Sequence, residues 1–175
     1  DDRSCIHHAH RTACANVRLL AERAGLNSPW TRDGVIFNQD EVVAAWVAKH
    51  LGIPGYAPPK DARAVGLMRK GRLGGGCIFE MTANPGVVMA TVAITDRQVL
   101  NRTTIGRWLW YPFRFLNCYR ITTMYAASNK AAGKFNHQMG MAVEARLLAA
   151  AHDGSDLVVN RMMRDECPWD WRLEP

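Results

Sequence analysis

The spacing of apolar residues changes along the chain from a helical period to a strand period near Ala62. Before this point, residues 12–25 and 41–51 carry apolar side chains three and four positions apart, and each stretch runs to a glycine. Both are predicted to be helices, and Asp40 is placed to cap the second through its carboxylate. A short β-like run at 34–37 lies between them.

Segments of β-forming residues, separated by turn-forming ones, follow Ala62. They span residues 62–69, 73–81 and 87–94, and a turn that contains glycine lies in each of the two intervals. Because both intervals are short, the three segments are predicted to pair as an antiparallel meander.

The second half of the chain alternates helices and strands. The expected elements are a helix at 100–116, a strand at 119–126, a helix at 129–139 and strands at 141–149 and 156–163. Pro112 lies inside the first of these helices and is expected to kink or end it, because proline lacks the N–H that a helix needs. Helices after an antiparallel meander, with one strand–helix crossing, predict an α/β or α+β domain whose mixed sheet is mostly antiparallel.

The composition is typical of one globular domain. The chain has 175 residues, of which 48% are apolar and 22% are charged. No apolar run approaches the roughly 20 residues that a membrane span needs, so no membrane partner is expected. The cysteines are odd in number and scattered, which favours a reduced, cytoplasmic setting. They are Cys5, Cys14, Cys77, Cys118 and Cys167.

The net charge of +6, carried mostly by arginine, has two explanations. It fits an ordinary solvated surface, and it also fits an attraction to an anion. Arginine favours bidentate phosphate contacts, so the anion could be a CoA tail, a nucleic acid or an acidic partner.

Residue types that bind metals gather at the N-terminus. They are Cys5, His7, His8, His10 and Cys14. Their spacing matches no structural zinc pattern, so no metal site is expected. This segment is interpreted as a disordered end or as an arm that docks on a partner.

One stretch, residues 120–141, combines the features of a phosphate-binding crevice. A β-rich run ends in small residues, Asn129 follows, and a helix then runs to Gly140. Where the end of a strand splays open beside the start of a helix, free backbone N–H groups favour phosphate-bearing cofactors.

This stretch resembles a signature of the GNAT superfamily of acyl-CoA N-acyltransferases. The positions that carry the resemblance are Asn129, Ala132, Phe135, Asn136, Gly140 and Met141, followed by Glu144, Arg146, Asp153, Gly154 and Trp169. The match covers residues 35–169, and the amino-acid sequences of several segments resemble those of GNAT proteins encoded by tailed bacteriophages. The resemblance implies a helical extension or arm over residues 1–34 and a GNAT-like acyltransferase domain over residues 35–175.

The resemblance also implies a sheet whose fourth and fifth strands splay apart, with acetyl-CoA between them as cosubstrate. The pantetheine arm would then pair with the fourth strand like an added strand. The backbone positions implied at the acyl end are Val92, Ala93 and Ile94.

The chain departs from the family at the phosphate site. The usual glycine-rich loop is missing from the segment 96–106. Arg102 and the hydroxyls of Thr103 and Thr104 would have to hold the phosphate oxygens instead.

Three residues of the signature have more than one interpretation. Asn129 is implied to bind pantetheine, but it also fits a plain helix cap, and both can hold together. Phe135 is expected to pack in the core, with contact to CoA as the alternative. Asn136 stands where many family members carry a tyrosine that protonates the leaving thiolate, and an amide is no general acid. Another group or water would serve instead, or the protein is not a transferase.

Acyl transfer from a thioester to an amine needs a base for the incoming ammonium and a proton donor for the thiolate. The catalytic candidates near the splay are Glu80 and Tyr125, with Asp96, Cys118 and His137 as further candidates. Each of the first two also has a plainer interpretation, since Glu80 fits an exposed strand residue and Tyr125 fits half-buried packing.

These observations lead first to an N-acetyltransferase that moves an acetyl group from acetyl-CoA to an unknown amine by direct attack. It would work in the cytoplasm, that of a bacterial host if a phage encodes it. An alternative is a catalytically degenerate phage protein that serves in the virion or binds a host protein. A third is nucleic-acid modification, which the excess of arginine suggests.

Overall fold

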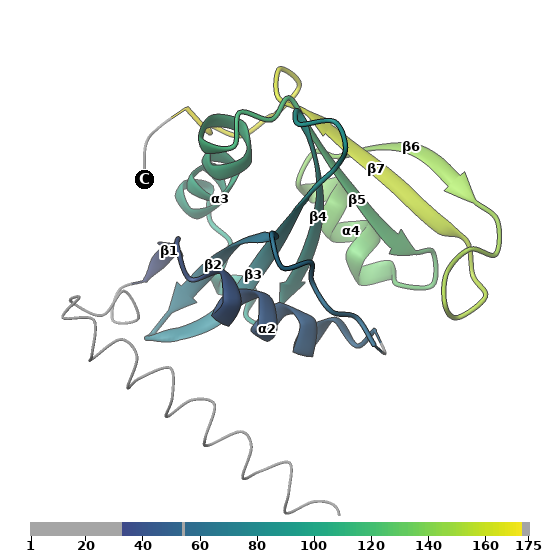
Figure 1. Cartoon of the computed structure of the whole chain (residues 1–175), viewed down its shortest axis with the longest axis horizontal. Helices are drawn as coiled ribbons and strands as arrows, with labels where there is room; N and C mark the ends of the chain where they lie inside the picture. Colours follow the sequence, from purple (N-terminus) through teal and green to yellow (C-terminus); the bar gives the residue numbers. More distant parts are fainter. Residues whose placement is uncertain (1–32, 54, 173–175) are drawn as a thin grey trace, which may run out of the picture.

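The structure, a computed structural model, describes residues 33–53 and 55–172 (Figure 1). The helix expected at 12–25 and the N-terminal cysteines and histidines lie outside these residues, as does most of the arm assigned to 1–34. The domain boundary therefore stays a prediction. Among the described residues, no helix is long and apolar enough to cross a bilayer.

Seven strands form one sheet in the described part of the chain. They are β1 (Gly34–Ile36), β2 (Arg63–Arg69), β3 (Arg72–Met81), β4 (Val87–Ile94), β5 (Arg120–Ala126), β6 (Ala142–Leu147) and β7 (Leu157–Met163). Their order is β1-β2-β3-β4-β5-β7-β6, and every neighbouring pair is antiparallel except β4–β5. The predicted fold class, a mixed and mostly antiparallel sheet flanked by helices, is confirmed.

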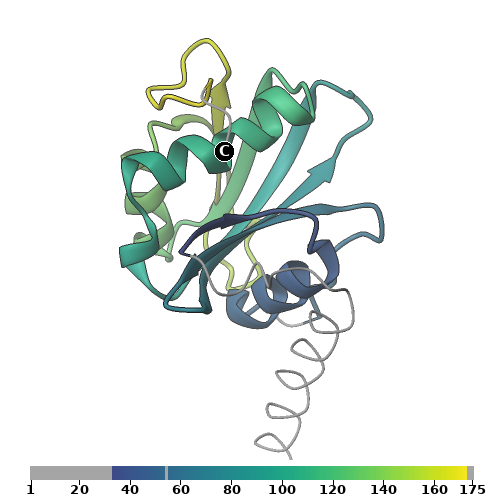
Figure 2. The ribbon, with the colours of Figure 1, turned by 90° about the vertical axis from the view of Figure 1, so that its left-hand side faces the viewer.

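The helices cover both faces of this sheet. Their bounds are α2 (Asp40–Leu51), α3 (Arg102–Trp110) and α4 (Lys130–Gln138), with short helical turns η2 (Arg97–Val99) and η3 (Tyr111–Phe115). On one face Val43 and Val47 of α2 share a core with Ile78 of β3. On the other face Trp108 of α3 shares a core with Phe79 of β3. Figure 2 shows α2 and α3 on opposite sides of the sheet.

A tight turn joins β2 and β3. Its residues Lys70 and Gly71 have φ values of 49° and 70°, as in a type I′ turn. Such turns match the right-handed twist of paired strands. The hairpin predicted at this position is confirmed, and Arg69 and Arg72 face each other across it.

The aromatic residues of α3 and η3 fill the core between these helices and the sheet. Tyr111 stacks on Phe37, with ring centroids 5.5 Å apart, and on Phe79, with centroids 5.9 Å apart. Trp108 and Phe113 are also buried. Because such rings each bury a large apolar area, this cluster fixes α3 against the sheet.

Pro112 ends the regular α-helix, as predicted. The α-helical pattern of α3 stops at Trp110, and a π-helical turn with Pro112 near its start follows. The Leu116 N–H donates to the Tyr111 carbonyl at 2.9 Å. This hydrogen bond spans five residues and so closes a wider ring than the bonds of an α-helix. Proline cannot supply an N–H here, and the wider turn carries the chain past it.

The cap predicted at Asp40 is wrong. The N-cap residue is Gln39, whose side chain makes no capping hydrogen bond, and Asp40 is the first residue of α2. The Asp40 carboxylate instead accepts from the Ala64 N–H at 2.6 Å and pairs with Arg63 at 3.2 Å. A long-range partner on β2 therefore outcompetes the local cap.

The C-terminal segment, residues 164–172, closes the core over α3 and α4. The Trp169 indole N–H donates to the Met139 carbonyl at 2.8 Å, at the end of α4. The Asp170 carbonyl lies against Gly106 of α3 so closely that a Cβ there would clash with it. Trp171 packs on Phe113 with ring centroids 5.5 Å apart.

Gly106→Ala tests this contact through the sign of its effect. Helix propensity alone would make alanine stabilising by about 1 kcal/mol at an internal helix position. The clash with a backbone oxygen is expected to outweigh this gain and to lower the free energy of unfolding by about 1–3 kcal/mol, as overpacking does. Urea unfolding followed by circular dichroism measures the difference, and a more stable variant would refute the close packing.

Candidate functional site

The parallel strands β4 and β5 pair along only part of their length. Their register comprises Val87–Arg120, Val88–Ile121 and Met89–Thr122, and then the two strands diverge. Figure 1 shows them side by side at the top of the view and apart lower down. We call the space beyond Met89 and Thr122 the gap. It is the splay between the fourth and fifth strands that the resemblance implied.

The gap exposes one backbone edge of β4. Residues 90–94 keep their partners on β3 but have none on β5. Backbone N–H and C=O groups on such an edge are available to an extended ligand. The predicted contact positions Val92, Ala93 and Ile94 all lie on this edge. The Val92 side chain packs toward α3, and Ala93 packs in the core beneath α2.

A narrow apolar pocket lies in the gap on the α3 and α4 side. Its volume is about 30 Å³. Its walls come from both strands and both helices and include Ala90, Val92, Trp108, Phe135 and Met162. The Phe135 ring stacks on Trp108, with centroids 6.3 Å apart. Phe135 thus packs in the core, as expected, and also lines the space beside β4.

Buried polar side chains form the other wall of this pocket. The Asn136 amide donates to the Ala132 carbonyl at 3.0 Å, and its oxygen accepts from the Thr123 hydroxyl at 2.8 Å. Asn160, the β7 neighbour of Thr123, is buried too, and its Nδ2 has no partner among the described residues. Asn136 therefore joins α4 to β5 by hydrogen bonds. It stands at the position expected for the general acid, but its amide cannot donate a proton to a thiolate.

The connection from β4 to α3 lies at the open end of the gap. Asp96 accepts from the Gln98 N–H at 2.9 Å and Asn101 accepts from the Thr104 N–H at 3.0 Å, so side chains cap both helical turns. Of the predicted phosphate ligands, Arg102 and Thr103 are exposed, whereas Thr104 is buried. Only the first two present their side chains to solvent.

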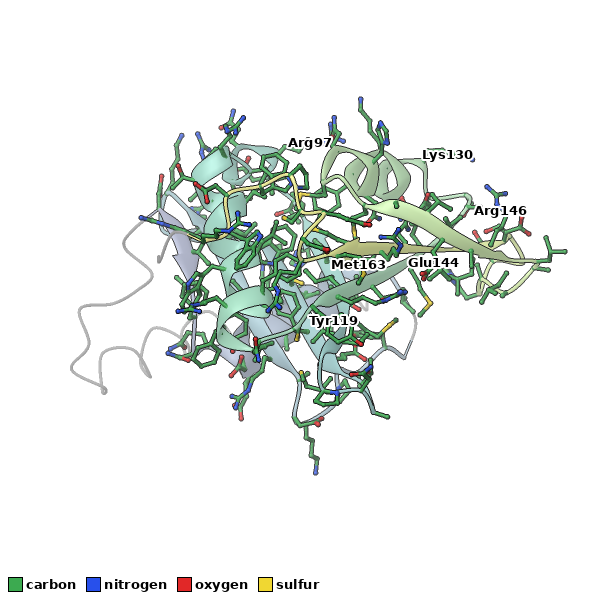
Figure 3. The ribbon with its side chains drawn as sticks, turned by 90° about the horizontal axis from the view of Figure 1, so that it is seen from above. Arg97, Tyr119, Lys130, Glu144, Arg146 and Met163 are labelled. Atoms are coloured by element: carbon green, nitrogen blue, oxygen red, sulfur yellow. The ribbon has the colours of Figure 1, made fainter. Side chains whose placement is uncertain are left out.

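The start of α4 forms the opposite side of this opening. Asn129 accepts from the Ala132 N–H at 3.0 Å, which confirms it as a helix cap. It remains exposed, as does Lys130, the first residue of the helix. Figure 3 places Lys130 and Arg97 of the β4–α3 connection on the same side of the molecule. Both elements thus carry an exposed cation on this side of the molecule.

Tyr125, a predicted catalytic residue, packs under α4. A Cβ at Gly133 would lie 3.1 Å from the Tyr125 hydroxyl oxygen, so the ring occupies the space that this glycine leaves. The side chain is half-buried. The position of the ring against Gly133 agrees with the plainer expectation that Tyr125 is a half-buried packing residue.

Glu80, the predicted base, lies on the face of the sheet opposite to α3, α4 and the apolar pocket. The Tyr56 hydroxyl donates to its carboxylate at 2.6 Å. On β4 its partner is Met89, where the gap begins. Burial, together with this hydrogen bond, raises the pKa of Tyr56 to about 12. Tyr56 lies in a proline-rich loop, and the spacing of residues in this loop predicts no contact with β3.

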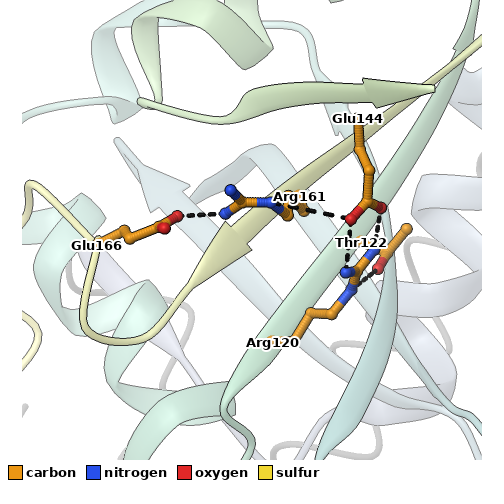
Figure 4. Close-up of polar contacts among 5 residues, drawn as sticks. All are labelled: Arg120, Thr122, Glu144, Arg161 and Glu166. Carbon is orange, nitrogen blue, oxygen red and sulfur yellow. Dashed lines mark hydrogen bonds and ion pairs between the residues drawn. The ribbon is translucent and has the colours of Figure 1, made fainter.

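A chain of ion pairs crosses β5, β7 and β6 on the same face as Glu80 (Figure 4). The Arg120 guanidinium donates to both carboxylate oxygens of Glu144, and this contact lowers the pKa of Glu144. Arg161 lies between Glu144, at 3.8 Å, and Glu166. The Arg120 Nε also donates to the Thr122 hydroxyl at 3.0 Å, one residue pair from the gap. Glu144 on β6 is therefore held by ion pairs to arginines of both β5 and β7.

The further catalytic candidates are scattered. Cys118 is buried, which raises the pKa of its thiol. Asp96 pairs with Arg69 at 3.2 Å, and His137 is exposed on α4. The structure thus does not bring these three together. Nowhere in residues 33–53 and 55–172 do three metal-ligating side chains meet.

The raised pKa of Tyr56 predicts a loss of stability in alkali. An unfolded tyrosine ionises near pH 10, while Tyr56 in the folded state stays protonated up to about pH 12. The hydrogen bond to Glu80 therefore stabilises the fold fully below pH 10, and its contribution falls as the pH rises from 10 to 12.

Urea unfolding of the wild type and Tyr56→Phe at about pH 9 and pH 11 measures this effect. The stability advantage of the wild type should be smaller at the higher pH. Tyr119→Phe, at an exposed tyrosine, is the matched control. An equal advantage of the wild type over Tyr56→Phe at both pH values would contradict the buried hydrogen bond.

Comparison with known proteins adds structural neighbours but no close relative. No protein-family model matches the chain, and no curated protein sequence matches it. A chimera of the spermidine N-acetyltransferase SpeG from Vibrio cholerae and hSSAT matches with a TM-score of 0.60 and 16% identity, over 77% of this chain and 98% of that chain. Mutant forms of the spermidine/spermine N-acetyltransferase SpeG from Vibrio cholerae match with a TM-score of 0.53 and 18% identity, over 70% of this chain and 75% of that chain.

A further structure, of a probable acetyltransferase, matches with a TM-score of 0.50 and 16% identity, over 61% of this chain and 64% of that chain. At these identities the similarity establishes the fold alone. The seven-stranded sheet, its single parallel pair and the flanking helices are those of the GNAT fold.

Proposed function

We propose that this protein is an N-acetyltransferase that uses acetyl-CoA and a primary or secondary amine. The observation that carries the proposal is the backbone edge of β4 at residues 90–94, which has no partner on β5 although both strands belong to one sheet. Buried backbone groups are almost always satisfied. A pantetheine arm, with its two amide groups, can satisfy such an edge as an added strand would.

The open end of the gap suits the phosphate groups of CoA. Arg97 is exposed in the β4–α3 connection, and Arg102 and Lys130 are exposed at the first positions of α3 and α4. Thr103 adds a hydroxyl in the first turn of α3. Positive side chains beside a helix N-terminus favour a pyrophosphate. Side chains would thus bind the CoA phosphates in place of the missing glycine-rich loop, with Arg102 and Thr103 as the main ligands.

The closed end of the gap defines where the reaction would take place. Pairing between the strands begins at Met89 and Thr122, so an arm that enters along Ile94, Ala93 and Val92 brings its thioester toward this point. A backbone N–H of β4 would polarise the carbonyl there. The amine nitrogen then attacks the carbonyl carbon, the C–S bond breaks, and the thiolate leaves with a proton taken from water.

Glu80 would remove the proton that the attacking ammonium must lose. It lies one strand away from the closed end, on the face of the sheet opposite α3 and α4. Around β5 this face is open, since Met124 is 46% exposed there. An acceptor amine can therefore approach from the side of Glu80, with Tyr56 holding the carboxylate in place.

The structural neighbours support this reaction class. Two of them are named as spermidine or spermidine/spermine N-acetyltransferases, proteins that act on amines. At 16% and 18% identity they do not identify the acceptor of this chain.

The small volume of the pocket supports a second candidate function. At about 30 Å³, the space between Val92 and Phe135 is narrow for a thioester, and Asn136 replaces the usual acid. A GNAT domain that has lost its reaction could bind a host protein or form part of a virion, as the similarity to phage proteins suggests. Acetyl-CoA binding separates the two candidates.

Calorimetric titration with acetyl-CoA tests the proposed function directly. The wild type is expected to bind with micromolar affinity and to melt at a higher temperature when acetyl-CoA is present, because a ligand of the native state stabilises it. Ala90→Leu fills the pocket beside β4 and should weaken binding at least tenfold. Ala142→Leu, at an exposed alanine of β6, is the matched control.

Arg102→Ala should weaken binding about tenfold through the loss of a charge-assisted phosphate contact. Arg114→Ala removes an exposed arginine near the other end of the α3 and η3 helices and should change little. If millimolar acetyl-CoA gives neither heat nor thermal stabilisation, the transferase proposal fails and the interaction role leads.

Glu80→Gln separates binding from chemistry. Loss of a general base lowers kcat by about 10²–10⁴-fold, while acetyl-CoA affinity should stay within about twofold. The measurement is acetyl transfer to a panel of amines, followed by release of the CoA thiol across a range of pH. The activity that remains should rise with pH, because free amine then replaces ammonium. Unchanged kcat in Glu80→Gln would exclude Glu80 as the base.

A further inference from the structure

A second hollow lies at the β2–β3 turn, on the far side of β4 from the gap. Its volume is about 490 Å³. Its walls are Arg69, Lys70, Arg72, Leu73, Gly74, Thr95 and Asp96. We call it the hairpin pocket. In the sheet order β2-β3-β4-β5, β4 lies between this hairpin and the gap, and Thr95 and Asp96 of the β4–α3 connection also line the pocket.

The charges of the hairpin pocket are unbalanced. Three cations face a single carboxylate, and that carboxylate is already engaged. Asp96 pairs with Arg69 at 3.2 Å and accepts from the Gln98 N–H at 2.9 Å. Lys70 and Arg72 are exposed and make no ion pair within the part of the chain that the structure describes. Two positive charges therefore remain available to a ligand.

The backbone that carries these charges is held firmly. The Lys70 N–H donates to Asp33 at 2.5 Å. The Gly74 carbonyl accepts from the N–H groups of both Thr95 and Asp96 at 2.9 Å, which joins the hairpin to the chain that leaves β4. A Cβ at Gly74 would lie 2.9 Å from the Asp96 Cβ, so the two segments are in close contact. The backbone positions of the cations are thus fixed before any ligand arrives, which reduces the backbone entropy lost on binding.

We propose that the hairpin pocket binds the phosphate groups of a small ligand that carries at least two negative charges. The planar guanidinium of Arg72 can donate two hydrogen bonds to one phosphate. The ammonium of Lys70 adds a positive charge on a flexible side chain. Thr95 also lines the pocket, and its hydroxyl donates to the Gly74 carbonyl at 3.3 Å. A concave site of this volume has the size of small-molecule sites, whereas a nucleic acid would favour a long basic stripe.

Two sources could supply such a phosphate. One is a free diphosphate or triphosphate, which would make the hairpin pocket a second ligand site. The other is the 3′-phosphate of the cosubstrate, which would make it an extension of the acetyl-CoA site. This second source depends on the proposed function, and the first does not.

Calorimetric titration with inorganic pyrophosphate tests the hairpin pocket without acetyl-CoA. The wild type should bind it, and the double variant Lys70→Ala/Arg72→Ala should bind it at least tenfold more weakly. Arg114→Ala, which removes an exposed arginine far from the hairpin, should bind as the wild type does. Because Lys70 and Arg72 are exposed and make no described ion pair, the double variant should fold, which its melting temperature checks.

A comparison of CoA with dephospho-CoA identifies the source. If the wild type prefers CoA and the double variant loses this preference, the 3′-phosphate occupies the hairpin pocket. If pyrophosphate binds and the preference is the same in both proteins, the ligand is a free polyphosphate.

Two results would overturn the proposal. One is the absence of pyrophosphate binding at about 10 mM, or equal binding by the wild type and the double variant. The other is binding of a short DNA duplex that the double variant abolishes, in the absence of pyrophosphate binding. Neither result bears on acetyl-CoA binding, which the Ala90→Leu titration measures separately.

Discussion

The arrangement of the site depends on where the parallel pairing between β4 and β5 stops. Three residue pairs hold the two halves of the sheet together, and the pairing ends at Met89 and Thr122. Continued pairing would satisfy the backbone of β4 and leave no place for a ligand. Because it stops, β4 keeps one free edge, α3 and α4 begin on either side of it, and Glu80 lies one strand away. The acetyl transfer proposed for this chain depends on that one interruption.

Large side chains of α3 and α4 pack over the place where the strands diverge. Trp108 and Phe135 stack there, and Asn136 binds Thr123 so that α4 stays over β5. These residues line the pocket of about 30 Å³. Their packing therefore limits what can enter the gap from this face. A thioester would have to displace part of this packing, which makes acetyl-CoA binding the decisive property of the molecule.

Local pattern was enough to predict the elements but not their long-range partners. The hairpin at Lys70, the break at Pro112 and the cap at Asn129 each depend on a few neighbouring residues, and all three were predicted. Asp40 failed as a cap because its partner, Ala64, lies on another element. The contact of Tyr56 with Glu80 escaped notice for the same reason. Of the three phosphate ligands predicted in the first turn of α3, only Thr104 has a buried side chain. Its burial depends on how that helix packs on the sheet, which the local pattern does not specify.

The C-terminal segment affects the order in which the molecule can be assembled. Residues 164–172 follow α3 and α4 in the sequence, and Trp169 binds the end of α4, Asp170 lies against α3, and Trp171 covers Phe113. The core between the helices thus stays open to water until these residues have been synthesised and have packed. Domains that close early can fold during translation. This core closes only once residues 164–172 are in place, so Trp108 of α3 and Phe135 of α4 pass through a stage in which chaperones can reach them.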